Sequence, residues 1–323
     1  MANAALLEIE HLKAGYATKA GFVRAVDDVS LSLRRGEFLG IAGESGCGKS
    51  TLAYAIMRLL RDNARIESGR IVLDGTDLAS LDEAGMNRHR WTKLAMVFQS
   101  AMNALNPVLS IEEQLVDAVL AHRSIPRAAA RGLAMEMLEL VDINADRLSS
   151  FPHQLSGGMR QRIMIAMALL LQPDLLIMDE PTTALDVVVQ RSILQKIQEL
   201  RRKLGFSVIF ITHDLSLLVE ISDSLAIMYA GKVCEYGPSK ELYDAPAHPY
   251  TKGLMNSFPS LTGPIGRMSG IEGQAPGLLD PKPGCRFAPR CGLAEPRCLS
   301  GDPVLAELSP GRACACVRCG GSL

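Results

Sequence analysis

A glycine-rich loop that ends in lysine and serine constrains the fold of this chain more than any other feature. The loop consists of Gly43, Glu44, Ser45, Gly46, Cys47, Gly48, Lys49 and Ser50. An apolar, strand-like run at residues 38–42 precedes it, and a helical run at residues 51–60 follows. A strand, a glycine loop and a helix in this order predict a phosphate-binding turn, in which backbone N–H groups and a helix N-terminus face an anion.

The polar residues at the end of the loop have separate expected roles. Lys49 is expected to neutralise the β- and γ-phosphates of a nucleotide, and the Ser50 hydroxyl to bind Mg²⁺. Thr51, the first residue of the helical run, is expected to contact the same nucleotide. Cys47 occupies a variable position of the pattern and is interpreted as small filler rather than as a redox thiol. The alternative is a glycine-rich turn of purely structural use.

Two carboxylates, Asp179 and Glu180, follow the apolar run at residues 175–178. A strand of a parallel sheet presents the side chains at its carboxyl end to the edge where such folds bind ligands. Asp179 is therefore expected to hold Mg²⁺, directly or through water. Glu180 is expected to orient and polarise the water that attacks the γ-phosphate. The alternative is that Glu180 only caps the strand.

A third motif lies at residues 155–162, with the sequence Leu-Ser-Gly-Gly-Met-Arg-Gln-Arg. Ser156, Gly157 and Gly158 precede a helical run at residues 159–171, so a hydroxyl, two small backbones and a helix N-terminus stand together. That combination favours anion binding. An ordinary N-terminal helix cap is the alternative.

The order of strand-like and helical runs predicts an α/β fold. Short strand-like runs at residues 6–12, 29–33, 38–42 and 70–73 come first, and Asp74-Gly75 predicts a hairpin turn. Helical spacing then dominates at residues 111–121 and 127–141. Apolar runs at 175–178, 207–211 and 225–228, with a helical run at 187–203, indicate a buried, mainly parallel sheet.

The phosphate loop, the serine-glycine-glycine segment and the strand-end carboxylates, in this order, resemble the ATP-binding cassette (ABC) ATPases. The resemblance implies a phosphate-loop NTPase fold: a RecA-like core, an antiparallel β subdomain and a helical subdomain at about residues 100–170. It covers nearly the whole chain. We place the nucleotide-binding domain at residues 1–236 and a small, loop-rich C-terminal domain at residues 237–323.

The resemblance also implies further site residues. Gln99 is similar to the glutamine that touches Mg²⁺ and the attacking water, and His213 to the switch histidine that contacts the γ-phosphate. Asp186 matches the loop that crosses the interface of a cassette dimer, and Tyr16 is expected to stack on adenine. The same family pattern implies that Ser156, Gly157 and Gly158 contact the ATP of a facing subunit.

Two short segments resemble markers of the ATPases of dipeptide, oligopeptide and nickel importers. They are residues 104–107, Ala-Leu-Asn-Pro, and residues 247–251, Ala-His-Pro-Tyr-Thr. This resemblance implies an ATP-hydrolysing importer subunit at the cytoplasmic face of the cell membrane. Its partners would be a second cassette ATPase, either a copy or a paralogue, two transmembrane permease subunits and, indirectly, an extracytoplasmic binding protein. His248 and Tyr250 are expected to pack the C-terminal part onto the cassette.

Six of the eight cysteines lie in the C-terminal part, and four of them have the spacing Cys285-x5-Cys291-x6-Cys298-x17-Cys316. In a reducing compartment such a cluster indicates metal binding before disulfides. The spacing is similar to the motif with which many of those ATPases hold a [4Fe–4S] cluster. Four sulfur ligands also suit zinc, and thiols without metal remain possible. Cys314 and Cys319 flank Cys316, and either could replace it as the fourth ligand.

Charge and hydropathy restrict the remaining alternatives. The chain of 323 residues has 34 basic and 35 acidic residues, which argues against bulk binding of nucleic acid. It has no apolar run of membrane-spanning length, and its start lacks the pattern of a signal peptide, so we expect a cytosolic protein. A soluble, non-transport ABC ATPase that acts on nucleic acid or ribosomes is the alternative function. A metal-sensing module that retains a cassette is a third.

Overall fold

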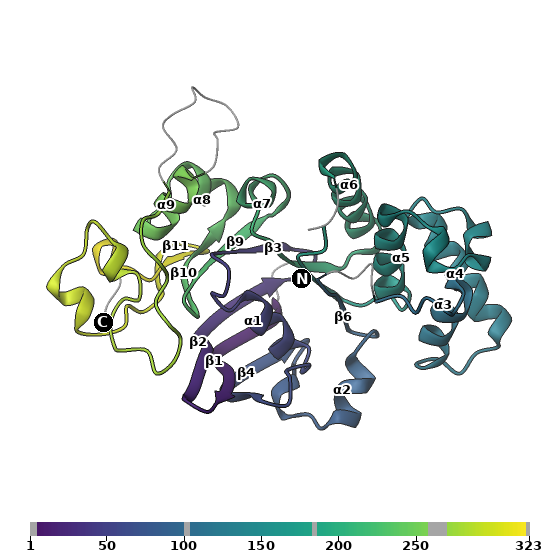
Figure 1. Ribbon diagram of the computed structural model, residues 1–323, viewed down its shortest axis with the longest axis horizontal. Helices are drawn as coiled ribbons and strands as arrows, with labels where there is room; N and C mark the ends of the chain where they lie inside the picture. Colours follow the sequence, from purple (N-terminus) through teal and green to yellow (C-terminus); the bar gives the residue numbers. More distant parts are fainter. Residues whose placement is uncertain (1–4, 100–103, 183–185, 258–269, 321–323) are drawn as a thin grey trace. The chain divides into compact units, whose positions relative to one another are not determined.

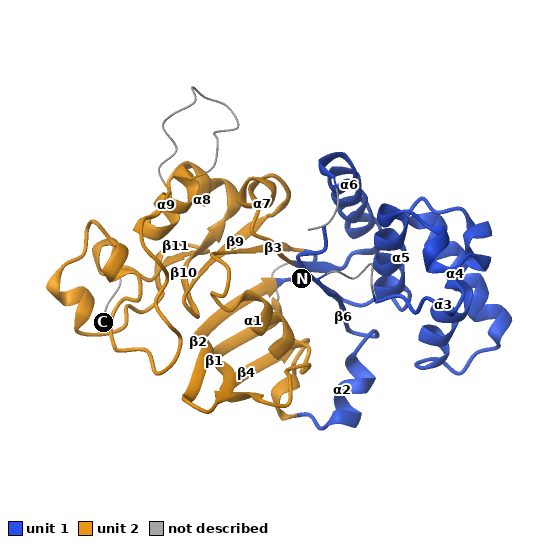
Figure 2. Cartoon of the chain, in the orientation of Figure 1, with its two compact units in different colours: residues 1–4, 34–36, 81–209 blue, residues 5–33, 37–80, 210–323 orange. Residues whose placement is uncertain are grey.

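The computed structural model describes residues 5–99, 104–182, 186–257 and 270–320 (Figure 1). The chain forms two compact units, which are interleaved along the sequence (Figure 2). One, here called the helical unit, contains residues 34–36 and 81–209; the other, the sheet unit, contains residues 5–33, 37–80 and the chain from 210 onward. The predicted division at residue 236 stays a prediction.

The first sheet of the sheet unit is antiparallel and has the order β2-β1-β4-β5. Its strands are β1 (Ala5–Thr18), β2 (Gly21–Arg34), β4 (Ala64–Leu73) and β5 (Thr76–Asp77). Along β2, Val29, Leu31 and Leu33 are buried while Asp28 and Ser32 are exposed. This alternation is typical of a sheet with one face against the core and one face in water.

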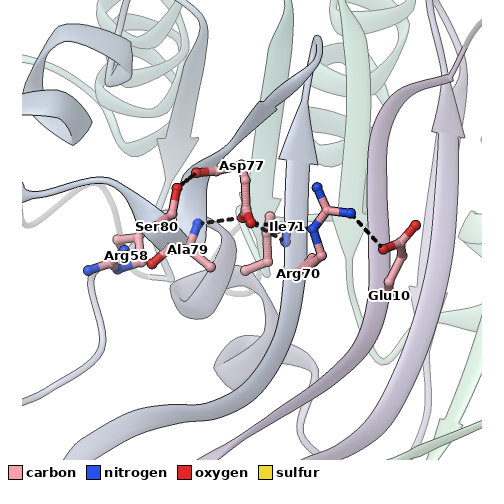
Figure 3. A network of polar contacts seen from close by, with 7 residues as sticks. All are labelled: Glu10, Arg58, Arg70, Ile71, Asp77, Ala79 and Ser80. Atoms are coloured by element: carbon pink, nitrogen blue, oxygen red, sulfur yellow. Dashed lines mark hydrogen bonds and ion pairs between the residues drawn. The ribbon is translucent and has the colours of Figure 1, made fainter.

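The predicted hairpin at Asp74-Gly75 is confirmed. Both residues have positive φ angles, 48° and 80°, as a tight two-residue turn between β4 and β5 requires. Asp77, just after the turn, accepts hydrogen bonds from the backbone N–H groups of Ala79 and Ile71, at 3.1 and 3.4 Å (Figure 3). Its neighbourhood also includes Arg70, which reaches both Asp77 and Glu10 of β1. The hairpin is therefore closed by side chains as well as by strand pairing.

The part of the second sheet that lies in this unit has the strand order β11-β12-β10-β9-β3. Its strands are β3 (Phe38–Ala42), β9 (Ser224–Tyr229), β10 (Lys232–Pro238), β11 (Ala306–Ser309) and β12 (Arg312–Cys314). β3 and β9 are parallel and buried along their whole length, whereas β10 and β12 continue the sheet in antiparallel pairing. The helices of this unit are α1 (Lys49–Ile56), α7 (Leu215–Ile221), α8 (Ser239–Asp244) and α9 (Pro249–Asn256).

The helix after the phosphate loop is shorter than the sequence predicts. Helical spacing runs to residue 60, but α1 ends at Ile56, and Arg58 has a φ of 52°. The Arg58 guanidinium donates hydrogen bonds to the carbonyl oxygens of Leu78 and Ala79, at 2.9 and 2.7 Å. Figure 3 shows Arg58 next to Ala79. These contacts hold the chain in a non-helical turn, which local propensity does not encode.

The helical unit contains the predicted helices and two strands of the parallel type. Its elements are α2 (Glu83–His89), β6 (Leu94–Val97), α3 (Ile111–Leu120), α4 (Arg127–Leu140), α5 (Gly157–Leu169), β7 (Leu175–Asp179) and α6 (Val187–Leu204). β6 pairs with β7 in parallel, from Leu94 opposite Leu175 to Val97 opposite Met178. β8 (Ser207–Ile211) is divided between the two units. The predicted strand and helix positions are thus confirmed, with boundaries shifted by a few residues.

Short 3₁₀ turns connect the longer elements. They are η1 (Leu78–Ser80), η3 (Ala145–Ser149), η4 (Pro152–Gln154), η5 (Ala288–Arg290), η6 (Pro296–Leu299) and η7 (Val317–Cys319). The last three lie in residues 285–319, here called the cysteine-rich part. Apart from these turns, its regular structure consists of β11 and β12. Those two strands join this part to β10.

Candidate nucleotide-binding site

The phosphate loop joins β3 to α1 in a conformation that requires glycine. Gly43, Gly46 and Gly48 have φ angles of 151°, 76° and 109°. A Cβ atom on Gly43 would lie 2.1 Å from the carbonyl oxygen of Met228, and one on Gly48 would lie 1.9 Å from that of Ala25. Neither contact is tolerable, so Gly43 and Gly48 are required by space as well as by φ, and Gly46 by its φ alone.

The Lys49 side chain is buried within the loop, with 6% of its surface exposed. Its ammonium donates hydrogen bonds to the carbonyl oxygens of Gly43 and Glu44, at 2.8 and 3.0 Å. The N-cap residue of α1 is Gly48, which has no side chain to cap the helix, and the amide dipoles there favour an anion. Burial raises the pKa of the Cys47 thiol, which agrees with its interpretation as filler. The loop therefore offers a fixed cation and an uncapped helix N-terminus to a phosphate.

Tyr16 lies at the end of β1, next to the helix that follows the loop. Its hydroxyl is 3.0 Å from the Thr51 hydroxyl, and its side chain is half-buried. The structure thus brings the predicted adenine-binding residue to α1. Its stacking role stays a prediction.

The strand-end residues of the helical unit lie at one edge of the β6–β7 pair. Asp179 ends β7 and is buried, and Glu180 follows it with a φ of 43°. Gln99 follows β6, which pairs with β7 in parallel, so both side chains reach the same edge. The Gln99 amide nitrogen donates a 3.0 Å hydrogen bond to the Glu180 carboxylate. A glutamine and a carboxylate held together in this way can orient a water molecule.

The serine-glycine-glycine segment and Asp186 also come together in the helical unit. Ser156 is the N-cap of α5 and accepts a hydrogen bond from Met159 N–H, while Asp186 caps α6 through Val189 N–H. A Cβ atom on Gly158 would lie 2.9 Å from Val189 Cγ1, so the second glycine allows the two helix starts to approach. Residues 184 and 185, which precede Asp186 in the predicted interface loop, lie outside the described residues.

His213 lies in the sheet unit, between β8 and α7. Its side chain is exposed, and the next residue, Asp214, caps α7 by accepting a hydrogen bond from Leu217 N–H at 3.1 Å. The cap fixes the backbone beside His213. The predicted contact of His213 with a γ-phosphate stays a prediction.

The four predicted cysteine ligands line one cavity: Cys285, Cys291, Cys298 and Cys316. Of the flanking thiols, Cys314 is buried in β12, and Cys319 donates to the carbonyl oxygen of Ala247. All eight cysteines are free, and burial raises the pKa of Cys285 as well as that of Cys316, the latter to about 11. The donor set has the chemistry of a sulfur-ligated metal site. Nevertheless, the described residues contain no group of three or more His, Cys, Asp or Glu side chains arranged to hold a metal ion.

Two contacts to the phosphate loop were not predicted from the sequence. The Tyr250 hydroxyl accepts a hydrogen bond from Glu44 N–H, and Arg290 forms an ion pair with the Glu44 carboxylate at 2.9 Å. More than 200 residues separate these partners, and no local pattern indicates their contact. The prediction that His248 and Tyr250 serve packing is thus incomplete for Tyr250.

A glycine loop with a buried lysine and a pair of strand-end carboxylates, both present in one chain, define a phosphate-loop nucleotide-binding protein. The family model described as ABC transporter matches residues 26–183, and the one described as oligopeptide/dipeptide transporter, C-terminal region, matches residues 234–298. The chain belongs to the ATP-binding proteins of ABC transporters, in the dipeptide and oligopeptide transporter group. Its activity is therefore ATP hydrolysis coupled to transport.

Individual relatives agree with this assignment. The chain is 46% identical over 289 residues to the dipeptide transport ATP-binding protein DppD of Bacillus subtilis, covering 88% of this chain and 86% of the relative. It is 44% identical over 316 residues to the oligopeptide transport ATP-binding protein OppD of Escherichia coli, covering 97% and 93%. A dimeric, post-hydrolysis structure of the ATP-binding cassette MJ0796 with ADP and Pi has a TM-score of 0.64 and 28% identity, over 72% of this chain and 98% of that one. The predicted cassette fold is confirmed.

Proposed function

We propose that the chain binds and hydrolyses ATP to drive the import of dipeptides or oligopeptides through a membrane permease. The observation that carries this proposal is the presence of both family matches on one chain, an ABC transporter segment and a peptide-transporter C-terminal region. The relatives described above are named for dipeptide and oligopeptide transport, which favours peptides over nickel as the cargo.

In the proposed site, the phosphate loop and Lys49 bind the β- and γ-phosphates, and Tyr16 contacts the adenine. Ser50, Asp179 and Gln99 would hold Mg²⁺, which would neutralise phosphate charge as the γ-phosphate is transferred. The positions of Lys49 and Asp179 support these roles, because Lys49 is a buried cation within the phosphate loop and Asp179 is a buried carboxylate at the end of β7.

Glu180 is the proposed base for hydrolysis. It orients the attacking water and accepts its proton as the bond to the γ-phosphate forms, and ADP leaves with the electron pair of the broken bond. The hydrogen bond from Gln99 supports this role, because the neutral amide of Gln99 fixes the position of the Glu180 carboxylate. His213 would contact the γ-phosphate and so detect its presence.

We propose that the ATPase works as a pair, with a copy or a paralogue. Ser156, Gly157 and Gly158 would then bind the ATP held by the facing subunit, and Asp186 would lie at the interface. The contact of Gly158 with the start of α6 supports a joint role of these two segments. The permease subunits would hold the pair at the cytoplasmic face of the membrane. In the described part of the chain, no helix is long and apolar enough to cross a bilayer.

The test of this function is reconstitution with the permease subunits and the peptide-binding protein in lipid vesicles. We expect uptake of a labelled dipeptide that requires ATP, and hydrolysis that rises when the dipeptide is added. The same complex with Lys49→Ala is the control and should be inactive. Copurification with ribosomes or nucleic acid in place of membrane subunits would instead support a non-transport ATPase.

We further propose that Cys285, Cys291, Cys298 and Cys316 bind a [4Fe–4S] cluster. Their spacing and the cavity that they share support the proposal, although their thiols are not gathered into a ready-made metal group. A cluster bound there would hold the loop-rich C-terminal part together, because that part has little regular structure of its own. Zinc is the alternative with the same ligands.

Metal analysis of anaerobically purified protein tests this second proposal. We expect iron and labile sulfide in near-equal amounts, a brown colour, and loss of both in Cys316→Ser. Because Cys314 and Cys319 do not line the cavity, Cys314→Ser and Cys319→Ser are the matched controls and should retain the cluster. A colourless, zinc-loaded protein would contradict the proposal.

A further inference from the structure

The phosphate loop is held from outside by residues of the C-terminal part. The Glu44 backbone N–H, in the second position of the loop, donates a 3.0 Å hydrogen bond to the Tyr250 hydroxyl. Tyr250 lies on α9 and is fully buried, with its ring centroid 4.5 Å from that of Tyr229 and 5.4 Å from that of Phe287. The acceptor, the Tyr250 hydroxyl, is thus fixed in place because its ring packs within an aromatic cluster.

Arg290 also binds Glu44, through an ion pair with the Glu44 carboxylate. One guanidinium nitrogen lies 3.0 and 2.9 Å from the two Glu44 carboxylate oxygens and 3.1 Å from the Tyr229 hydroxyl. The other nitrogens donate to the carbonyl oxygens of Glu272 and Ile271. The Arg290 side chain is 7% exposed and that of Glu44 is 27% exposed, so water screens the pair only weakly.

A second arginine reaches the loop indirectly. Arg286 donates to the carbonyl oxygen of Ala230 and forms an ion pair with Asp27. The neighbouring Gly231 N–H donates to the Cys47 carbonyl oxygen at 2.9 Å. Both arginines lie between Cys285 and Cys291, so one short segment of the cysteine-rich part supports two places in the phosphate loop.

Glu44 links this support to the lysine of the site. Its N–H binds Tyr250, its carboxylate binds Arg290, and its carbonyl oxygen accepts a hydrogen bond from the Lys49 ammonium at 3.0 Å. A shift of the Glu44 peptide would therefore displace an acceptor of Lys49. The three glycines of the loop have many accessible conformations, so an external support reduces the entropy lost when a ligand fixes the loop.

We propose that Arg290 and Tyr250 are positioning residues for ATP: they hold Glu44, and with it the phosphate loop, in the shape that binds the nucleotide. The C-terminal part thus contributes to ATP affinity without touching ATP. The inference rests on the proposed function, in which the loop at residues 43–50 binds ATP.

Equilibrium binding of a fluorescent ATP analogue to the full chain tests this inference. We expect Arg290→Gln to raise the dissociation constant about tenfold, within the usual range of coupling between sites. Arg290→Lys keeps the charge and should recover part of the affinity, and Tyr250→Phe should weaken binding while its ring still packs. In the assembled transporter, KM for ATP should rise while kcat at saturating ATP stays within about twofold, because neither residue contacts the reacting atoms.

The matched control is Arg297→Gln, which removes the same charge from the same part of the chain. Arg297 is 53% exposed and pairs with Glu295, away from the loop. The affinity of this variant for the ATP analogue should therefore equal that of the wild type. The double variant Glu44→Gln, Arg290→Gln should bind no more weakly than Glu44→Gln alone, because the two side chains act as one pair.

Unchanged affinity in both Arg290→Gln and Tyr250→Phe would overturn the inference, as would additive effects of Glu44→Gln and Arg290→Gln. Should Arg290→Gln not fold, Arg290→Lys and Tyr250→Phe decide the outcome. If the wild-type chain itself does not bind the analogue, the proposed function fails instead.

Discussion

At the scale of single residues, Glu180 is the side chain on which proposed hydrolysis depends most. Glu180→Gln keeps the oxygen that accepts the hydrogen bond from Gln99 but cannot take a proton. We expect a variant that binds ATP normally and hydrolyses it about 10²- to 10⁴-fold more slowly. Phosphate release by the assembled transporter and binding of an ATP analogue measure the two properties. Glu241→Gln, which is exposed on α8, is the control, and near-normal turnover in Glu180→Gln would remove Glu180 from the mechanism.

His248 makes stability depend on pH. Burial lowers its pKa from 6.5 to about 4, and its Nδ1 atom accepts a hydrogen bond from Tyr250 N–H. Below pH 6.5, His248 is protonated in the unfolded chain, whereas in the folded chain it stays neutral until the pH reaches about 4. The contribution of this histidine to stability is therefore complete above pH 6.5 and is lost as the pH falls toward 4, by roughly 3 kcal/mol in total.

Urea unfolding between pH 4.5 and 7.5 measures this dependence. His248→Asn retains a side-chain acceptor for the start of α9 but has no titrating group, so its free energy of unfolding should vary less over this range. His153→Gln, at an exposed position, should keep the wild-type slope. Equal slopes in the wild type and His248→Asn would contradict the expectation.

At the scale of elements, the end of α1 depends on the hairpin that follows it. Arg58 donates hydrogen bonds to the Leu78 and Ala79 carbonyl oxygens, which both lie in η1. Arg58→Gln removes a charged donor from two acceptors and should lower the free energy of unfolding by about 1 to 3 kcal/mol. Thermal or urea unfolding measures the loss. Arg61→Gln, on an exposed residue of the same connection, should change stability by less than about 0.5 kcal/mol.

The elements also show which parts of the fold a sequence can predict. β3, the phosphate loop and α1 follow one another in the chain, so local spacing predicts them together, as it does Asp179 and Glu180 at the end of β7. The early end of α1 was not predictable, because Arg58 is held by carbonyl groups 20 residues away. Likewise, the contacts of Tyr250 and Arg290 with Glu44 depend on tertiary packing, and nothing near any of the three residues indicates them.

At the scale of the whole molecule, the cysteine-rich end of the chain is part of the second sheet of the sheet unit. β12 pairs with β10, with Cys314 opposite Glu235 and Ala313 opposite Tyr236. The Glu235 side chain is fully buried and binds the backbone N–H groups of Ala247 and His248 as well as Arg312. One buried carboxylate thus joins β10 to the start of α9, 12 to 13 residues further along the chain, and to β12, which is 77 residues further along.

Arg312→Leu tests how firmly this end of the chain is built into the fold. The substitution removes the cation at 3.2 Å from a carboxylate with no exposed surface, and the two backbone donors alone compensate the charge incompletely. We expect a loss of about 2 to 4 kcal/mol in the free energy of unfolding, near the cost of leaving one member of a buried ion pair without its partner.

Arg318→Leu is the control, because Arg318 is 46% exposed and pairs with Glu295 at the surface. A double variant that adds Glu235→Gln removes the buried charge itself and should recover part of the loss. If Arg312→Leu unfolds like the wild type, the C-terminal strands contribute little to the stability of this sheet, and the ion pair is a consequence of the fold rather than a cause.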